Sequence, residues 1–369
     1  MVSKQRIVIK LGTSTMTGGA KKLSAARLVD LARQMCALQS AGCQVVLVSS
    51  GAMAAGREVL GFPALPKHLP AKQMLAAVGQ PRLMSIYEQV FTIYDTWVAQ
   101  VLLTRADFAD RRRYLNARNT LDALLQQGVV PIVNENDTVA TEEIRFGDND
   151  NLSAQVANLV EADLLVLLTD QDGLYTADPR QDPAANLIHE VPPGAFSEQL
   201  WQAAGGTSNG LGTGGMVTKL QAAELARHAG TTVVIAFGAE PDVLLRLARG
   251  EELGTRFLPA ANKLEARKHY ILSGSQAAGE LEVDGGAARA LARGGSLLPA
   301  GMVRVSGSFE RGDTVRVLGP NARQIAVGLS SYPADDLAQL CGKQSTEIET
   351  ILGYTFGDEI IHRNNMVLV

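Results

Sequence analysis

Two lysines lie within four residues of a glycine. One is at the end of an apolar run, and the other follows a glycine-rich segment. Lys10 closes the apolar run 7–9 and precedes Gly12. A buried lysine is costly unless it meets an anion, and a glycine lets backbone N–H groups approach a phosphate. Lys219 follows the glycine-rich segment 210–215, whose N–H groups can wrap a triphosphate while the lysine meets the transferring phosphoryl group. Either lysine alone also fits an ordinary position near the surface.

Asparagine and aspartate are concentrated in two segments, 134–137 (Asn-Glu-Asn-Asp) and 147–151 (Gly-Asp-Asn-Asp-Asn). Such residues commonly serve turns and helix N-caps. Two groups so near each other can also line a polar pocket for an ammonium group, a metal-nucleotide or a catalytic lysine. The turns at 49–51 (Ser-Ser-Gly) and 169–170 (Thr-Asp) also follow apolar runs, and have compositions that suit anion or nucleotide contacts as well as plain turns.

The glycine segment 210–215 matches the GxGxxG pattern, but a dinucleotide site requires a strand directly before it. Residues 196–204 have a helical pattern instead, so we reject an NAD site. The sequence also contains no GxxxxGK[ST] motif of the P-loop nucleotidases. We therefore expect a flexible glycine loop that opens a helix and presents Lys219 from its first turn.

Apolar runs alternate with segments of helical periodicity up to about residue 258. The runs are 7–9, 45–48, 97–103, 129–133, 164–168 and 233–236. They lack polar alternation, which is typical of strands covered by helices on both faces. Leu28, Leu31, Met35 and Leu38 form one apolar helix face between the first two runs. The pattern predicts a parallel α/β sandwich with its ligand site beyond the carboxyl ends of the strands.

The pattern changes after residue 262, and from 277 short strand-like runs are separated by glycine turns. Examples are 302–305, 314–317 and 324–327. We expect three parts: a first domain over 1–258, a linker over 259–276 and a small β-rich domain over 277–369. A chain of 369 residues agrees with two domains.

Composition excludes several classes of protein. A net charge of −4 gives no general attraction to nucleic acid or to an anionic membrane. The three cysteines and five histidines show no metal-ligand spacing, and an odd cysteine count excludes complete intrachain pairing. No secretory signal begins the chain, and no apolar run approaches the ~18 residues that cross a bilayer. We expect a soluble, cytoplasmic protein without a metal site of its own.

Taken together, the motifs resemble the amino-acid kinase family over essentially the whole chain, in the branch with a C-terminal PUA domain. The segments that carry this resemblance are 8–14, 49–52, 75–80, 134–137, 146–154, 168–170 and 212–216, with 296–299 and 307–313 for the PUA domain. The resemblance implies a three-layer αβα sandwich with a mainly parallel sheet, plus a small β-rich PUA-like domain. It also implies transfer of the ATP γ-phosphoryl group, with Mg²⁺, to the side-chain carboxylate of L-glutamate, the first step of proline biosynthesis.

By this resemblance, Lys10 and Lys219 would neutralise the transferring phosphoryl group and Asp150 would hold both lysines. The glutamate site would consist of Ser50, Asp137, Asn149, Asn134 and Asp148. The nucleotide site would consist of Lys10, Gly12, Thr169, Asp170, Thr213, Gly214, Gly215, Met216 and Lys219. A carboxylate acceptor is already an anion, so no general base is needed and catalysis is positioning plus charge neutralisation.

The resemblance also implies inhibition by L-proline and a homo-oligomer, and it leaves open transfer of the product to the next enzyme. Three other functions compete with this interpretation: a related kinase for aspartate, N-acetylglutamate or a nucleotide; RNA binding through the PUA-like domain; and a pseudo-kinase scaffold. From residue 277 onward, eight Lys and Arg stand against eleven Asp and Glu, a net −3 that disfavours contact with a phosphate backbone.

Overall fold

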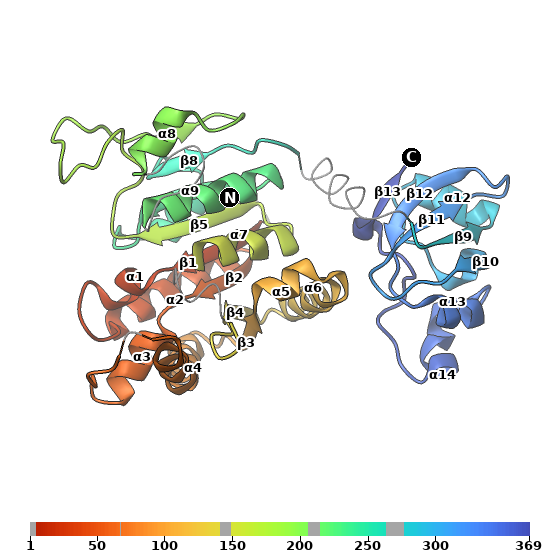
Figure 1. Ribbon diagram of the computed structural model, residues 1–369, viewed down its shortest axis with the longest axis horizontal. Helices are drawn as coiled ribbons and strands as arrows, with labels where there is room; N and C mark the ends of the chain where they lie inside the picture. The colour runs from red at the N-terminus through yellow and green to blue at the C-terminus, as the bar shows by residue number, and fades with distance from the viewer. Residues whose placement is uncertain (1–4, 67, 141–148, 206–214, 263–276) are drawn as a thin grey trace. The chain divides into compact units, whose positions relative to one another are not determined.

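The computed structural model of the chain describes residues 5–66, 68–140, 149–205, 215–262 and 277–369 (Figure 1). Contacts divide the chain into two compact units, Met1–Ala109 with Asn116–Asn262, and Asp110–Leu115 with Lys263–Val369. The boundaries predicted at 258 and 277 stay predictions, and most of the predicted linker lies outside the described residues.

The first unit is built on one eight-stranded sheet in the order β3-β4-β2-β1-β5-β7-β8-β6. Its strands are β1 (Arg6–Leu11), β2 (Gln44–Ser49), β3 (Val98–Leu103), β4 (Val130–Glu135), β5 (Leu164–Thr169), β6 (Glu190–Val191), β7 (Thr232–Phe237) and β8 (Thr255–Phe257). All neighbouring strands are parallel except β7 and β8. The predicted mainly parallel sheet is confirmed.

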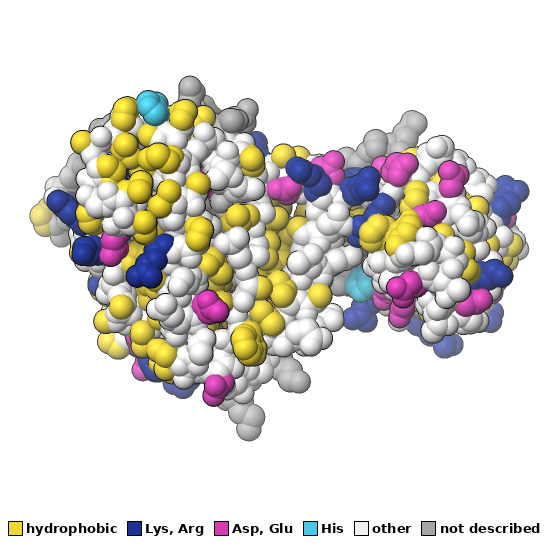
Figure 2. All heavy atoms as spheres, turned by 90° about the horizontal axis from the view of Figure 1, so that it is seen from below, with side chains coloured by type: hydrophobic (Ala, Val, Ile, Leu, Met, Phe, Trp, Pro, Cys, Tyr) yellow, Lys and Arg dark blue, Asp and Glu magenta, His cyan; other side chains and the backbone are white. Residues whose placement is uncertain are grey.

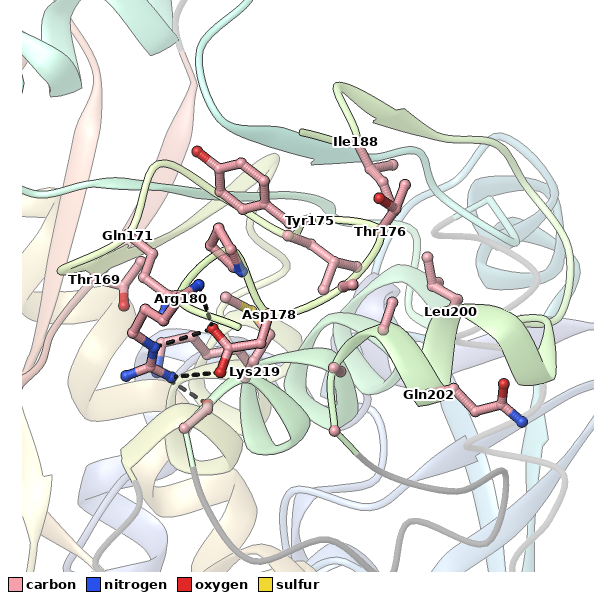
Figure 3. A pocket seen from close by; sticks show the side chains of 18 of the residues that line it. Thr169, Gln171, Tyr175, Thr176, Asp178, Arg180, Ile188, Leu200, Gln202 and Lys219 are labelled. Carbon is pink, nitrogen blue, oxygen red and sulfur yellow. Dashed lines mark hydrogen bonds and ion pairs between the residues drawn. The ribbon is translucent and has the colours of Figure 1, made fainter. Parts of the chain in front are cut away.

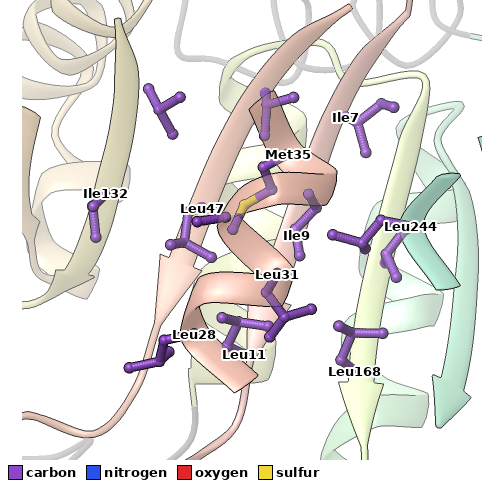
Figure 4. Close-up of a cluster of buried hydrophobic side chains, with 14 of the residues drawn as sticks. Ile7, Ile9, Leu11, Leu28, Leu31, Met35, Leu47, Ile132, Leu168 and Leu244 are labelled. Carbon is purple, nitrogen blue, oxygen red and sulfur yellow. The ribbon is translucent and has the colours of Figure 1, made fainter. Parts of the chain in front are cut away.

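Helices cover both faces of this sheet and make the unit a three-layer αβα sandwich (Figure 1). They are α1 (Thr13–Thr17), α2 (Ala25–Ser40), α3 (Ala52–Val59), α4 (Leu69–Thr92), α5 (Arg105–Ala109), α6 (Arg111–Gln126), α7 (Asn149–Leu159), α8 (Glu198–Ala203), α9 (Met216–His228) and α10 (Val243–Ala248). On one face, Ile7, Ile9 and Leu11 of β1 pack with α2, α4 and α10 (Figure 4). Because side chains alternate along a strand, Lys10 lies on the opposite face, where α7 and α9 pack.

The apolar face predicted for α2 is confirmed. Leu28, Leu31, Met35 and Leu38 are buried, and Figure 4 shows Leu28, Leu31 and Met35 directed at the sheet. The helix begins at a hydroxyl N-cap, because the side chain of Ser24 accepts a hydrogen bond from a backbone N–H in the first turn. Burial of this face fixes α2 over β1 and β2.

One strand differs from the expectation. The run 97–103 was expected to be covered on both faces, but β3 is an edge strand that is only partly buried, and Trp97 just before it is 78% exposed. An edge strand has one neighbour and less helix cover, so an apolar composition does not by itself bury it. Strand β5, in the middle of the sheet, is buried along its whole length as expected.

The second unit contains a five-stranded sheet in the order β10-β9-β11-β12-β13. Its strands are β9 (Gly279–Val283), β10 (Met302–Gly307), β11 (Thr314–Leu318), β12 (Gln324–Leu329) and β13 (Met366–Leu368), and its helices are α12 (Gly285–Ala292), α13 (Ala334–Leu340) and α14 (Ile348–Leu352). Leu281, Val315 and Val317 lie in its apolar core. The small β-rich domain and its three predicted strand segments are confirmed. Among the described helices of the chain, none is long and apolar enough to cross a bilayer.

Candidate active site

The carboxyl ends of β1, β2, β4 and β5 meet at one edge of the large sheet, because these strands are parallel neighbours. Lys10 is in register with Val48 of β2 and Leu167 of β5. Helix α7 packs across this part of the sheet and begins at the same edge. The arrangement gathers polar residues that lie far apart in the chain, at the place predicted from strand polarity.

Three buried charged side chains form the first polar group at this edge, and we call Lys10, Asp150 and Lys219 the lysine cluster. Nζ of Lys10 lies 2.6 Å from Oδ1 of Asp150, and Nζ of Lys219 lies 3.1 Å from Oδ2. The Asp150 side chain is 1% exposed, so these ion pairs are shielded from water. One carboxylate cannot balance two ammonium groups, and the cluster retains a positive charge that suits an anionic ligand.

The first turn of α9 holds the lysine cluster together. Thr218 was not predicted as a site residue, yet its hydroxyl lies 3.0 Å from Oδ2 of Asp150. Lys219 also donates to the carbonyl of Gly215, at 3.2 Å, and that glycine begins the helix with φ +60. The positive φ at Gly215 is a conformation that glycine adopts without strain. The helix that was expected to present Lys219 one turn after the glycine loop is confirmed.

Neutral side chains form the second polar group, and we call Ser50, Asn134 and Asn149 the amide cluster. Nδ2 of Asn149 donates to Oδ1 of Asn134 at 2.8 Å, to the carbonyl of Ser49 at 2.9 Å and to Oγ of Ser50 at 3.2 Å. Both asparagines are more than nine-tenths buried. The cluster ties the ends of β2 and β4 to the first residue of α7.

Asp137 follows β4 and is only partly exposed. Burial raises the pKa of its carboxyl to about 6, because removal from water disfavours the charged form. A carboxylate in this position gains from a cationic partner, such as the ammonium group of an amino acid. The other predicted acidic neighbour, Asp148, lies outside the described residues.

A large pocket of about 1340 Å³ lies next to the lysine cluster (Figure 3). Thr169, Asp170, Gly215, Met216 and Lys219, all predicted for nucleotide binding, line it. Figure 3 shows Tyr175 and Arg180, from the segment between β5 and β6, on one side and Leu200 of α8 on the other. The pocket therefore joins Lys219 to a space with both polar and apolar walls. Thr213 and Gly214 lie outside the described residues.

Comparison with known proteins agrees with this geometry. Residues 5–236 match the family model described as "Amino acid kinase family", and residues 279–352 match the PUA domain. The chain belongs to the amino acid kinase family. The resemblance seen in the motifs is therefore confirmed, as is the PUA domain.

Curated relatives of this kinase match along nearly its whole length. It is 57% identical to a glutamate 5-kinase of Herpetosiphon aurantiacus, over 98% of both chains. It is 55% identical to a glutamate 5-kinase of Deinococcus radiodurans, over 99% of this chain and 100% of the relative. It is 54% identical to a glutamate 5-kinase of Shewanella amazonensis, over 99% of this chain and 96% of the relative.

Gly12 lies close to the ammonium group of Lys10. The φ of Gly12 is −77°, which any residue adopts, so its backbone does not require glycine. A Cβ built there would lie 3.6 Å from Nζ of Lys10, and the missing side chain therefore leaves space beside the ammonium group. This space, Lys219 and the large pocket fit the triphosphate of ATP, the phosphoryl donor that the family implies.

Among the described residues of the kinase, no group of three or more His, Cys, Asp or Glu side chains could hold a metal ion.

Gln80 on α4 contacts Asn134, although the sequence analysis gave no role to this residue beyond its place in the segment 75–80. No sequence motif or residue spacing predicts a role for Thr218 or Gln80, because each contacts a residue that lies far away in the sequence.

Proposed function

We propose that this kinase transfers the γ-phosphoryl group of ATP to the side-chain carboxylate of L-glutamate and forms L-glutamyl 5-phosphate, the first step of proline biosynthesis. The observation that carries the proposal is the position of the lysine cluster, which adjoins the large pocket on one side and the amide cluster on the other. The curated relatives, named glutamate 5-kinases, support this acceptor.

Helix α7 explains how donor and acceptor meet. Asn149 and Asp150 are its first two residues, and consecutive helical residues point about 100° apart. One therefore joins the amide cluster and the other joins the lysine cluster. The two halves of the site are fixed to one rigid element, which holds the acceptor carboxylate in line with the γ-phosphoryl group.

Lys10 and Lys219 neutralise negative charge on the transferring phosphoryl group. Negative charge builds up around the transferring group, and preorganised cations stabilise it without reorganisation. Asp150 keeps both ammonium groups in place through its two ion pairs. The acceptor carboxylate attacks as an anion, so no residue has to remove a proton.

The remaining predicted residues take the outer parts of the two substrates. Ser50, Asn134 and Asn149 orient glutamate, and Asp137 with Asp148 pairs with its ammonium group. The nucleotide is held by Gly12, Thr169, Asp170 and the loop from Thr213 to Met216. Mg²⁺ bound to the phosphates would supply additional positive charge there.

Several properties of this kinase extend the proposal beyond the site. We expect L-proline to inhibit at or near the glutamate site, and we expect a homo-oligomer. The labile acyl phosphate favours transfer to the next enzyme, and the use of ATP and free glutamate fits the cytoplasm.

In Figure 2, Lys and Arg side chains of the second unit are interspersed with Asp and Glu on the face shown, which gives RNA binding little support.

The test is glutamate-dependent release of ADP from Mg-ATP, with hydroxylamine present to trap the acyl phosphate as a hydroxamate. L-Aspartate and N-acetyl-L-glutamate are assayed beside L-glutamate. We expect turnover with glutamate alone, and a loss of about 100-fold or more in Lys10→Ala and Lys219→Ala. The exposed Lys343, in the second unit, provides the matched control Lys343→Ala with unchanged turnover. Turnover with another acceptor only would refute the proposed substrate, and no turnover with any would refute the proposed reaction.

A further inference from the structure

A chain of side-chain amides runs from the amide cluster to the edge of the large sheet. Nδ2 of Asn134 donates to Oε1 of Gln80 at 2.9 Å, and Nε2 of Gln80 donates to Oε1 of Gln100 at 3.0 Å. Gln80 lies in the middle of α4 and is half-buried, whereas Gln100 is exposed on β3. Gln80 thus links a helix without any predicted site residue to the acceptor side of the site.

Backbone groups determine which atom of each amide faces which partner. The backbone N–H of Glu135 donates to Asn134 at 2.9 Å, so the atom it meets must be the side-chain oxygen. The amide nitrogen of Asn134 then faces Gln80, which must present an acceptor. At the other end, the carbonyl of Ser49 accepts only, and fixes the amide nitrogen of Asn149. Each hydrogen bond in this series of amides therefore has a fixed donor and acceptor, and Gln80 supplies the acceptor for Asn134.

The residue before Gln80 explains why α4 can reach this position. A Cβ on Gly79 would lie 1.7 Å from the carbonyl oxygen of Ala52, which no side chain permits. Helix α4 therefore touches the first turn of α3 at Ala52, two residues after Ser50. Gly79 sets the helix against the Ser50 part of the amide cluster, and Gln80 bonds the Asn134 part.

We propose that Gln80 is a positioning residue for the acceptor, which supplies the acceptor for the buried amide N–H of Asn134 and so holds that side chain in place beside Asn149. The inference rests on the proposed function, because it assigns these asparagines to the glutamate site. Without an acceptor at position 80, the buried N–H of Asn134 loses its partner, and only the bonds that its oxygen accepts from Glu135 and Asn149 still hold the side chain. Affinity for glutamate then falls, while the nucleotide site is unaffected, because the described partners of the Gln80 side chain are Asn134 and Gln100.

The experiment compares steady-state kinetics of the full chain and four variants. Gln80→Met keeps the length of the side chain and removes the acceptor, and we expect an increase of about fivefold in KM for glutamate. KM for ATP and the melting temperature should stay near the parent values. Gln80→Glu keeps an acceptor oxygen for Asn134, and the exposed Gln100 can turn its N–H toward it, so this variant should restore KM for glutamate.

Gln89 supplies the matched control on the same helix, because its side chain bonds only to Ser85 in the contacts described. Gln89→Met should leave both KM values unchanged. Gln80→Asn, which withdraws the amide by one methylene, serves as the second variant if Gln80→Met does not fold, and we expect it to raise KM for glutamate similarly.

An unchanged KM for glutamate in folded Gln80→Met or Gln80→Asn would overturn the inference. Equal increases in KM for glutamate and ATP would also overturn it, since they would indicate general damage by loss of helix packing. If the parent enzyme turns over glutamate and either of these results is found, the inference is refuted and the proposed function stands. A parent that does not turn over glutamate refutes the proposed function, and the inference falls with it.

Discussion

The lysine cluster and the amide cluster lie at the same edge of one sheet, and both contain buried polar side chains, yet they differ in charge. The lysine cluster holds two cations on one carboxylate through two ion pairs. The amide cluster is neutral and directional, because backbone donors and acceptors fix each amide.

This difference separates two tasks of a phosphoryl-transfer site. Neutralisation of the transferring group needs positive charge that is already in place. Orientation of a carboxylate acceptor needs fixed dipoles. Changes to the lysine cluster should therefore act on turnover, and changes to the amide cluster on affinity for the acceptor.

The largest effect is expected from Asp150→Asn. The change leaves two buried ammonium groups side by side without their carboxylate, and should cost about 3 kcal/mol of folding stability. Turnover should fall by about 1000-fold as the lysines move apart. Thermal unfolding and the hydroxamate assay measure the two effects. Glu240→Gln, which removes a partly exposed ion pair with Arg246, is the control and should change stability by less than about 1 kcal/mol. Equal stability of both variants would contradict the account.

A smaller effect is expected from Asn149→Ala, which removes the hydrogen bonds that join β2, β4 and α7. We expect KM for glutamate to increase about 30-fold with a minor change in KM for ATP, because several hydrogen bonds that orient the acceptor site are lost. Initial rates over a range of both substrates measure this. Asn158→Ala, at the far end of α7, provides the control. A loss of turnover with unchanged KM for glutamate would place Asn149 with the lysine cluster instead.

Gly12→Ala tests the space beside Lys10. The backbone at Gly12 accepts alanine, and the new methyl group meets its neighbours at ordinary contact distances. Stability should therefore be unchanged, while KM for ATP rises or turnover falls by about tenfold, because a phosphate is displaced. Gly285→Ala, where a Cβ also has ordinary contacts, is the control. Parent-like kinetics in Gly12→Ala would show that no phosphate occupies this space.

The smallest effect concerns pH. Burial raises the pKa of Asp137 to about 6, above its ordinary value, so the carboxylate forms fully only above that pH. If the carboxylate pairs with the ammonium group of glutamate, protonation competes with binding, and KM rises as pH falls. We expect an increase of about fourfold at about pH 5.5 relative to about pH 7.5. Asp137→Asn should raise KM at neutral pH and remove this pH dependence. A pH dependence that persists in the variant would assign it to another group.

Much of the fold follows from local pattern, because a strand covered on both faces must be apolar along its whole length. Strand β5 shows this, and so does the buried face of α2. The position of Lys10 could also be predicted, since parallel strands end at the same edge. Strand β3 was predicted less well because the order of strands in a sheet is not encoded in the apolar pattern of any one strand.

Gln80 and Thr218 could not be predicted as site residues for a similar reason, because the packing of distant elements is not encoded in a local pattern. Gln80 is one of several polar residues on α4, and only the close contact of Gly79 with α3 brings it to Asn134. Thr218 acts through the register between α9 and α7. The separation of Asn149 from Asp150 follows from helical rotation, but it depends on a helix start that residue composition does not determine.

The central claim is that the two clusters serve different substrates, and the most direct test is the binding of L-glutamate without nucleotide. Isothermal titration calorimetry would compare the parent, Lys219→Ala and Asn149→Ala. We predict that Lys219→Ala binds glutamate with nearly the affinity of the parent, whereas Asn149→Ala binds it much more weakly. Equal losses of affinity in both variants, or a loss confined to Lys219→Ala, would contradict the division of the site into a charge-neutralising half and an acceptor-orienting half.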